Sequence, residues 1–104
     1  MADLSQEQWK EELSKDDNAV ILDVRTNEEV EEGIIPNAIH IDIYQGQEFI
    51  NQIEALDKSK TFYVYCRSGG RSAQACAIMN QLGFANAKNL MGGITDWTGE
   101  VVNH

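Results

Sequence analysis

Short apolar runs alternate along the chain with stretches in which apolar residues recur every three or four positions. Short continuous apolar runs are typical of buried parallel strands, and periodic stretches are typical of helices that cover a sheet. Strands are predicted at residues 19–24, 39–41, 61–65 and 87–90. The alternation of strands and helices predicts one α/β domain with a mainly parallel sheet.

Capping signals and apolar spacing predict the helices between these strands. Ser5 to Gln8 and Thr26 to Glu29 are capping boxes, in which side chains satisfy the first free N–H groups of a helix. The predicted helices cover residues 5–13, 26–32, 47–56 and 71–82, with one more short helix within 92–97. Four acids of the second helix are interpreted as a solvated face near its positive dipole end, rather than as a metal site. These are Glu28, Glu29, Glu31 and Glu32.

The length of 104 residues suffices for one compact domain and not for two. The net charge of −9 argues against nucleic acids and anionic membranes as partners, because both require a basic face. No apolar run approaches the roughly 20 residues that a membrane-spanning helix needs. Residues 1–6 lack the basic and apolar regions of a signal peptide, so a cytoplasmic location is expected.

Cys66 and Cys76 are the two cysteines of the chain. So few cysteines argue against a disulfide framework. Two cysteines and two histidines suit a zinc site poorly, so no metal is expected. Cys76 lies among small residues of a predicted helix and is interpreted as part of the core, although a role as a resolving thiol stays open.

The three arginines of the chain all lie in two short segments, 22–25 and 66–72. The second segment reads Cys66-Arg67-Ser68-Gly69-Gly70-Arg71-Ser72 and joins a predicted strand to a predicted helix. Free N–H groups at the helix start, a glycine-rich turn and two guanidinium groups all favour an anionic sulfur. The serine hydroxyls can add hydrogen bonds. We therefore expect Cys66 to be a nucleophilic thiolate.

A second polar group follows the neighbouring predicted strand. Asp23 and Arg25 lie at the carboxyl end of residues 19–24, as Cys66 does for residues 61–65, so the two groups are expected at one rim of the sheet. We expect Asp23 to anchor an arginine or loop amides, because a carboxylate that faced the thiolate would raise its pKa. His40 is interpreted as structural, because its context is that of a strand.

Four blocks of the chain, in order and spacing, resemble those of the single-domain rhodanese-like sulfurtransferases. They are residues 22–25, 33–39 and 66–72, and residues 90–94 with Trp97. Two departures from the family pattern are visible, Ile34 in place of a frequent histidine and Asn37 in place of the usual glycine. Asn tolerates a left-handed backbone, so the turn at Asn37 is expected to persist.

The resemblance implies a three-layer α/β fold, with a central five-stranded parallel sheet flanked by helices. It implies that Cys66 takes the outer sulfur of a donor such as thiosulfate and holds it as a persulfide, with no cofactor. A thiol, cyanide or a protein cysteine would then accept the sulfur. The amides of residues 67–72 would stabilise the persulfide, and Arg67 and Arg71 would hold the anionic donor.

Three alternatives remain open at this point. Cysteine-dependent phosphatases and arsenate reductases use a similar cradle, but their loop has one residue more between cysteine and arginine than the four found between Cys66 and Arg71. A catalytically silent recognition module would not need the intact cysteine loop. A persulfide carrier that acts between protein partners would need the same loop as a thiosulfate-using enzyme, so sequence does not separate these two functions.

Overall fold

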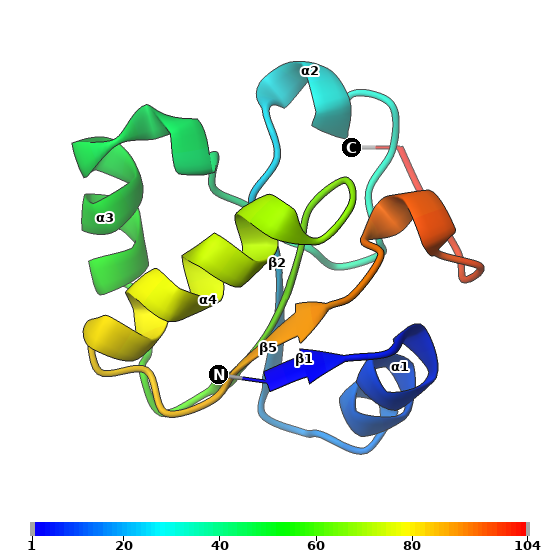
Figure 1. Cartoon of the computed structure of the whole chain (residues 1–104), viewed down its shortest axis with the longest axis horizontal. Coiled ribbons are helices and arrows are strands. Elements are labelled where there is room, and N and C mark those ends of the chain that lie inside the picture. The colour runs from blue at the N-terminus through cyan, green and yellow to red at the C-terminus, as the bar shows by residue number, and fades with distance from the viewer. Residues whose placement is uncertain (1, 104) are drawn as a thin grey trace.

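The computed structural model describes residues 2–103, in which five parallel strands form one sheet in the order β1-β5-β4-β2-β3. The strands are β1 (Ala2–Leu4), β2 (Ala19–Asp23), β3 (Ile39–His40), β4 (Thr61–Tyr65) and β5 (Ala87–Leu90). Figure 1 shows the twisted sheet between helices that cover its two faces. The predicted α/β class and the five-stranded parallel sheet are confirmed.

The helices within residues 2–103 connect the strands of the sheet. They are α1 (Gln6–Ser14), α2 (Asn27–Val30), α3 (Gln47–Glu54) and α4 (Gly70–Gln81), with short 3-10 turns at η1 (Ile43–Gln45) and η2 (Ile94–Asp96). Ser5 and Thr26 both close the predicted capping boxes, which confirms the reading of these two helix starts. None of the helices within residues 2–103 combines the length and the apolar character needed to cross a membrane.

The side chains of β4 alternate between the two faces of the sheet and fill two separate cores. Phe62 and Val64 point into a core that α3 and α4 cover, together with Cys66. Tyr63 and Tyr65 point into the opposite core, where they pack edge-on against Trp9 of α1. The short helix α2 instead lies near the carboxyl rim of the sheet, next to the loop that precedes α4 (Figure 1).

The strand β1 was not predicted from the sequence. Its three residues show no pattern of their own, and it forms because it pairs in parallel with β5, with Leu4 opposite Leu90. The left-handed turn at Asn37 is confirmed by a φ angle of 70°. His40 has a structural contact, since its Nε2 atom lies 2.6 Å from the backbone oxygen of Arg25. Residue His104 lies outside the described residues.

Candidate active site

The chain turns sharply after β4, so that Cys66 lies against the start of α4. Gly69 makes this turn with a φ angle of 107°, which glycine adopts without the strain of a side chain. The sulfur of Cys66 accepts hydrogen bonds from the backbone N–H of Gly69, at 3.1 Å, and from the hydroxyl of Ser72, at 3.3 Å. Cys66 is almost fully buried, with 1% of its surface exposed.

These contacts decide the acidity of the thiol. Burial of Cys66 acts to raise its pKa, because a thiolate loses hydration. The hydroxyl of Ser72 and the backbone N–H groups of Ser72, Gly69 and Ser68 oppose burial and outweigh it. The pKa of Cys66 therefore lies below the ordinary value for a cysteine, so more of the protein carries the nucleophilic thiolate.

Residues 93–95, which follow β5, hold the cysteine loop in place through backbone contacts. The N–H of Ile94 donates to the carbonyl of Cys66 at 3.0 Å, and the N–H of Thr95 donates to that of Arg67 at 3.0 Å. Gly93 lies so close that a Cβ atom there would be 2.5 Å from the oxygen of Arg67. Gly93 is therefore needed for the close packing of this segment on the cysteine loop.

A buried polar network supports Ser72 from the sheet side. Its hydroxyl lies within hydrogen-bond distance of the Oδ1 atom of Asn89, a residue of β5 that is 3% exposed. The amide of Asn89 donates to the carboxylate of Asp3 at 2.9 Å and to the carbonyl of Gly69 at 3.2 Å. Sequence reasoning missed Asn89. Its signal was a polar residue inside a strand predicted to be buried.

Asp23 and Arg25 form a buried ion pair at the same rim of the sheet. The Nη2 atom of Arg25 donates to the Oδ2 atom of Asp23 at 2.8 Å, and its Nε atom contacts both carboxylate oxygens at 3.1 Å. Burial acts to lower the pKa of Arg25, but Asp23, together with smaller effects of Tyr65 and Glu29, more than offsets burial and the pKa rises. Asp23 thus anchors an arginine, as the sequence predicted.

Arg25 faces the α2 segment and not the sulfur. Its guanidinium donates to the backbone oxygen of Gly33 at 2.7 Å and to that of Glu29 at 3.3 Å. Within residues 2–103 no hydrogen bond joins Asp23 or Arg25 to Cys66. The pair therefore supports the site at a distance, because it fixes the short helix that lies beside the cysteine loop.

Arg71 is engaged by an acid that the sequence analysis assigned to a solvated helix face. Its two Nη atoms donate to the two carboxylate oxygens of Glu29 at 2.6 and 2.8 Å. Both side chains are largely buried, with 19% and 18% of their surfaces exposed. Arg71 holds the pKa of Glu29 at about 2. The interpretation of Glu29 as solvated is wrong, because a residue distant in sequence covers it.

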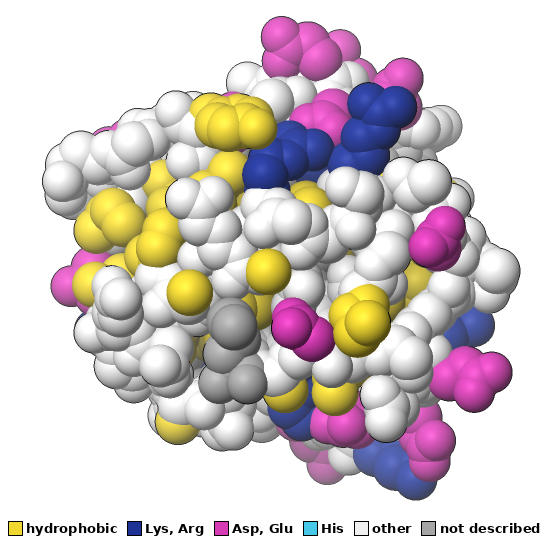
Figure 2. All heavy atoms as spheres, in the orientation of Figure 1, with side chains coloured by type: hydrophobic (Ala, Val, Ile, Leu, Met, Phe, Trp, Pro, Cys, Tyr) yellow, Lys and Arg dark blue, Asp and Glu magenta, His cyan; other side chains and the backbone are white. Residues whose placement is uncertain are grey.

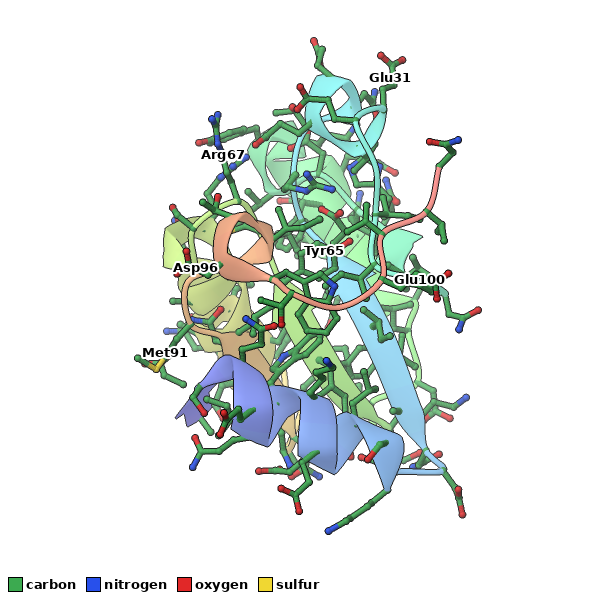
Figure 3. All side chains as sticks on the ribbon, turned by 90° about the vertical axis from the view of Figure 1, so that its right-hand side faces the viewer. Glu31, Tyr65, Arg67, Met91, Asp96 and Glu100 are labelled. Carbon is green, nitrogen blue, oxygen red and sulfur yellow. The ribbon has the colours of Figure 1, made fainter. Side chains whose placement is uncertain are left out.

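Arg67 and Ser68 are exposed at the surface of the loop. Figure 3 shows Arg67 projecting from the body of the molecule, whereas Tyr65 lies inside it. Among residues 2–103 the guanidinium of Arg67 has no hydrogen bond or ion pair. Figure 2 shows dark blue Lys and Arg side chains grouped over this part of the surface, with acidic side chains next to them. Arg67 is thus the loop arginine that remains available to an anion.

Cys76 is buried in the same core as Cys66. Burial raises the pKa of Cys76 to about 12, so its thiol stays protonated at neutral pH. This environment agrees with its interpretation as a core residue. Among the described residues, no three His, Cys, Asp or Glu side chains are gathered in a way that could hold a metal ion.

Comparison with known proteins extends the similarity over nearly the whole chain. The family model for the rhodanese-like domain matches residues 5–100. The protein YtwF of Bacillus subtilis (strain 168) is 41% identical over 91 residues, which cover 88% of this chain and 84% of that protein. Thiosulfate sulfurtransferase GlpE of Coxiella burnetii is 36% identical over 91 residues, which cover 88% and 80% of the two chains.

Solved structures agree with the sequence comparison. A crystal structure of a rhodanese-like domain protein from Staphylococcus aureus superimposes with a TM-score of 0.83 at 30% identity, and the match covers 100% of this chain and 99% of that chain. The family model and the solved structure thus both support the same family. This chain therefore belongs to the rhodanese-like domain family.

Proposed function

We propose that the protein is a sulfurtransferase that carries sulfane sulfur as a persulfide on Cys66. The observation that supports this most directly is the sulfur of Cys66, which accepts hydrogen bonds from Gly69 and Ser72 at the start of α4. These donors lower the pKa of the thiol despite its burial. A thiolate held in this way is a nucleophile that needs no separate general base and no cofactor.

In the first step, the thiolate attacks the outer sulfur of thiosulfate or of an organic persulfide. A bond forms between this sulfur and the sulfur of Cys66, while the sulfur–sulfur bond of the donor breaks. Sulfite or a thiolate leaves with the electron pair. The N–H groups of residues 68–72 then stabilise the negative charge on the transferred sulfur. The similarity to a relative named thiosulfate sulfurtransferase supports thiosulfate as one donor.

In the second step, a thiophilic acceptor attacks the outer sulfur of the persulfide. Cyanide would leave as thiocyanate, and a thiolate of a small molecule or a protein would leave as a persulfide. The bond to Cys66 breaks and restores its thiolate, so the cycle balances without an oxidant or a reductant. The covalent intermediate divides one transfer into two steps that are each easier.

The cradle suits sulfur better than a phosphoryl group. Four residues separate Cys66 from Arg71, which makes a smaller ring than the phosphatase loop. Arg71 also donates to Glu29 through both Nη atoms, whereas a phosphatase uses its loop arginine to bind the transferred group. Hydrolysis of an aryl phosphate that disappears in Cys66→Ser would favour the phosphatase alternative.

The proposal is tested by the mass of the intact protein. The reduced chain is incubated with thiosulfate, freed of excess donor and analysed by mass spectrometry. We expect the mass to rise by one sulfur atom, to return to its original value when cyanide is added, and to stay unchanged in Cys66→Ser. No gain of sulfur by a chain whose thiol is free would contradict the proposal. Loading by protein persulfides but not by thiosulfate would favour the carrier function.

The role of Arg71 is tested by a variant of this residue and a matched control. Arg71→Ala removes a charge beside the thiol and leaves Glu29 unpaired there, so we expect thiosulfate to load Cys66 much more slowly. Lys88→Ala also removes a positive charge, but Lys88 pairs with Glu12 of α1 on the other side of the sheet. Equal effects of the two changes would show that Arg71 has no particular influence on the donor.

A further inference from the structure

Glu29 is held in one position by contacts on both sides. Its Oε1 atom accepts hydrogen bonds from the backbone N–H of Thr26, at 3.2 Å, and from the Thr26 hydroxyl, at 3.1 Å, as the last residue of a capping box. On the other side both of its oxygens accept from Arg71. The carboxylate is thus preorganised next to the cysteine loop and stays charged at any pH near neutrality.

The Glu29–Arg71 ion pair affects the net charge that a sulfur donor meets at the cysteine loop. Asp23 balances the charge of Arg25, and Glu29 balances that of Arg71, which leaves Arg67 as the unpaired arginine of the described site. Arg71 belongs to the first turn of α4, directly after the cysteine loop, so the carboxylate that neutralises it also lies beside that loop. The net charge of −9 adds a far field that opposes anions, although salt screens it.

We propose that Glu29 is a specificity-determining residue, which favours organic persulfides over thiosulfate as sulfur donors. The inference rests on the proposed function. Thiosulfate carries two negative charges, whereas an organic persulfide carries at most one on its sulfur atoms. A site with a single uncompensated arginine therefore discriminates against the dianion. With a persulfide donor, the outer sulfur is transferred to Cys66 and the donor's inner sulfur leaves as a thiolate.

Glu29→Gln tests this inference because it removes the charge and keeps the shape. Glutamine closes a capping box with Thr26 as glutamate does, so α2 is expected to remain folded. A glutamine oxygen can also still accept one hydrogen bond from Arg71. The control is Glu28→Gln, which removes the same charge from an exposed neighbour on the same helix.

The experiment measures single-turnover loading of Cys66 with each of two donors, by rapid quenching and mass spectrometry. The donors are thiosulfate and the persulfide of N-acetylcysteine methyl ester, which has no charge apart from that on sulfur. Removing one nearby negative charge should speed loading about threefold for each negative charge on the donor. For Glu29→Gln we thus expect about a tenfold gain with thiosulfate and about a threefold gain with the persulfide.

An unchanged ratio of the two rates in Glu29→Gln, or the same change in Glu28→Gln, would overturn the inference. A parent protein that gains sulfur from neither donor would instead contradict the proposed function. Calorimetric binding of thiosulfate to the Cys66→Ser protein, with and without Glu29→Gln, needs no sulfur transfer. Tighter binding with Glu29→Gln would support an effect of Glu29 on dianions, and equal binding would exclude it.

Discussion

The hydroxyl of Ser72 lies 3.3 Å from the sulfur of Cys66 and so connects the first turns of α4 to the end of β4. The same hydroxyl lies within hydrogen-bond distance of Asn89 on β5. A hydroxyl has a single proton, so it donates to one acceptor at a time. A thiolate is the more strongly charged acceptor, and Ser72 therefore favours the ionised form of Cys66.

Ser72→Ala is expected to raise the pKa of the Cys66 thiol, since the lost hydrogen bond stabilises the charged form by about 1.5–3 kcal/mol. The alkylation rate with iodoacetamide should rise with pH and level off above the pKa. In the parent protein the midpoint should lie below the ordinary value for a cysteine. Ser14→Ala on α1 is the control, and an unchanged midpoint in Ser72→Ala would contradict the role of its hydroxyl.

Gly93→Ala is expected to disrupt the cysteine loop. The new Cβ atom would lie 2.5 Å from the carbonyl oxygen of Arg67 and 2.6 Å from that of Cys66, at a φ angle of 58°. Gly46→Ala is a matched control, because its φ angle is 61° and no atom lies within 4 Å of the added Cβ. Gly46→Ala should lower the free energy of unfolding by about 1–3 kcal/mol through backbone strain. Gly93→Ala should lower the free energy of unfolding clearly more, and it should also slow the loading of Cys66 with sulfur. Equal losses in urea unfolding would argue against the close contact.

Asp23→Ala leaves the guanidinium of Arg25 buried without its partner. Breaking a buried pair in this way typically costs about 3–5 kcal/mol, which urea unfolding would measure. Glu11→Ala breaks an ion pair of the same 2.8 Å length with Lys15, but this pair is exposed and should contribute no more than about 1 kcal/mol. Similar losses of unfolding free energy in the two variants would show that burial of the Asp23–Arg25 pair does not increase its contribution to stability.

Cys76→Ala should retain the gain of one sulfur atom from thiosulfate. Its thiol is fully buried and its pKa is about 12, so it neither attacks a donor nor resolves a persulfide readily. The smaller side chain should lower the free energy of unfolding by about 1–2 kcal/mol. A variant that folds but no longer accepts or releases sulfur would revive the role of Cys76 as a resolving thiol.

Local patterns predicted most of the fold. The apolar runs at residues 61–65 and 87–90 coincide with β4 and β5, and the serine and threonine caps mark the starts of α1 and α2. These features depend on neighbours in the sequence. The strand β1 does not, because residues 2–4 become a strand only through pairing with residues 88–90 at the other end of the chain.

The candidate site likewise combines features that the local sequence predicts with features that depend on distant contacts. Cys66 and its amide donors lie within seven consecutive residues, so the sequence could place them together. The partner of Arg71 is 42 positions away, and the capping box marks Glu29 as a residue of a helix start but not as a partner of Arg71. Asn89 reaches Ser72 across 17 positions. Such contacts depend on how a helix packs on a rim or a sheet, which residue patterns do not specify.

The contacts that hold the cysteine loop also affect when the thiol of Cys66 becomes reactive during synthesis of the chain. Asn89 and residues 93–95, which hold the loop, are made after Cys66, and Asp3 reaches Asn89 only when both ends of the chain meet. A nascent or partly unfolded chain lacks these partners and carries an ordinary, mostly protonated thiol. Because oxidation proceeds through the thiolate, the sulfur becomes reactive only once the fold that controls it is complete.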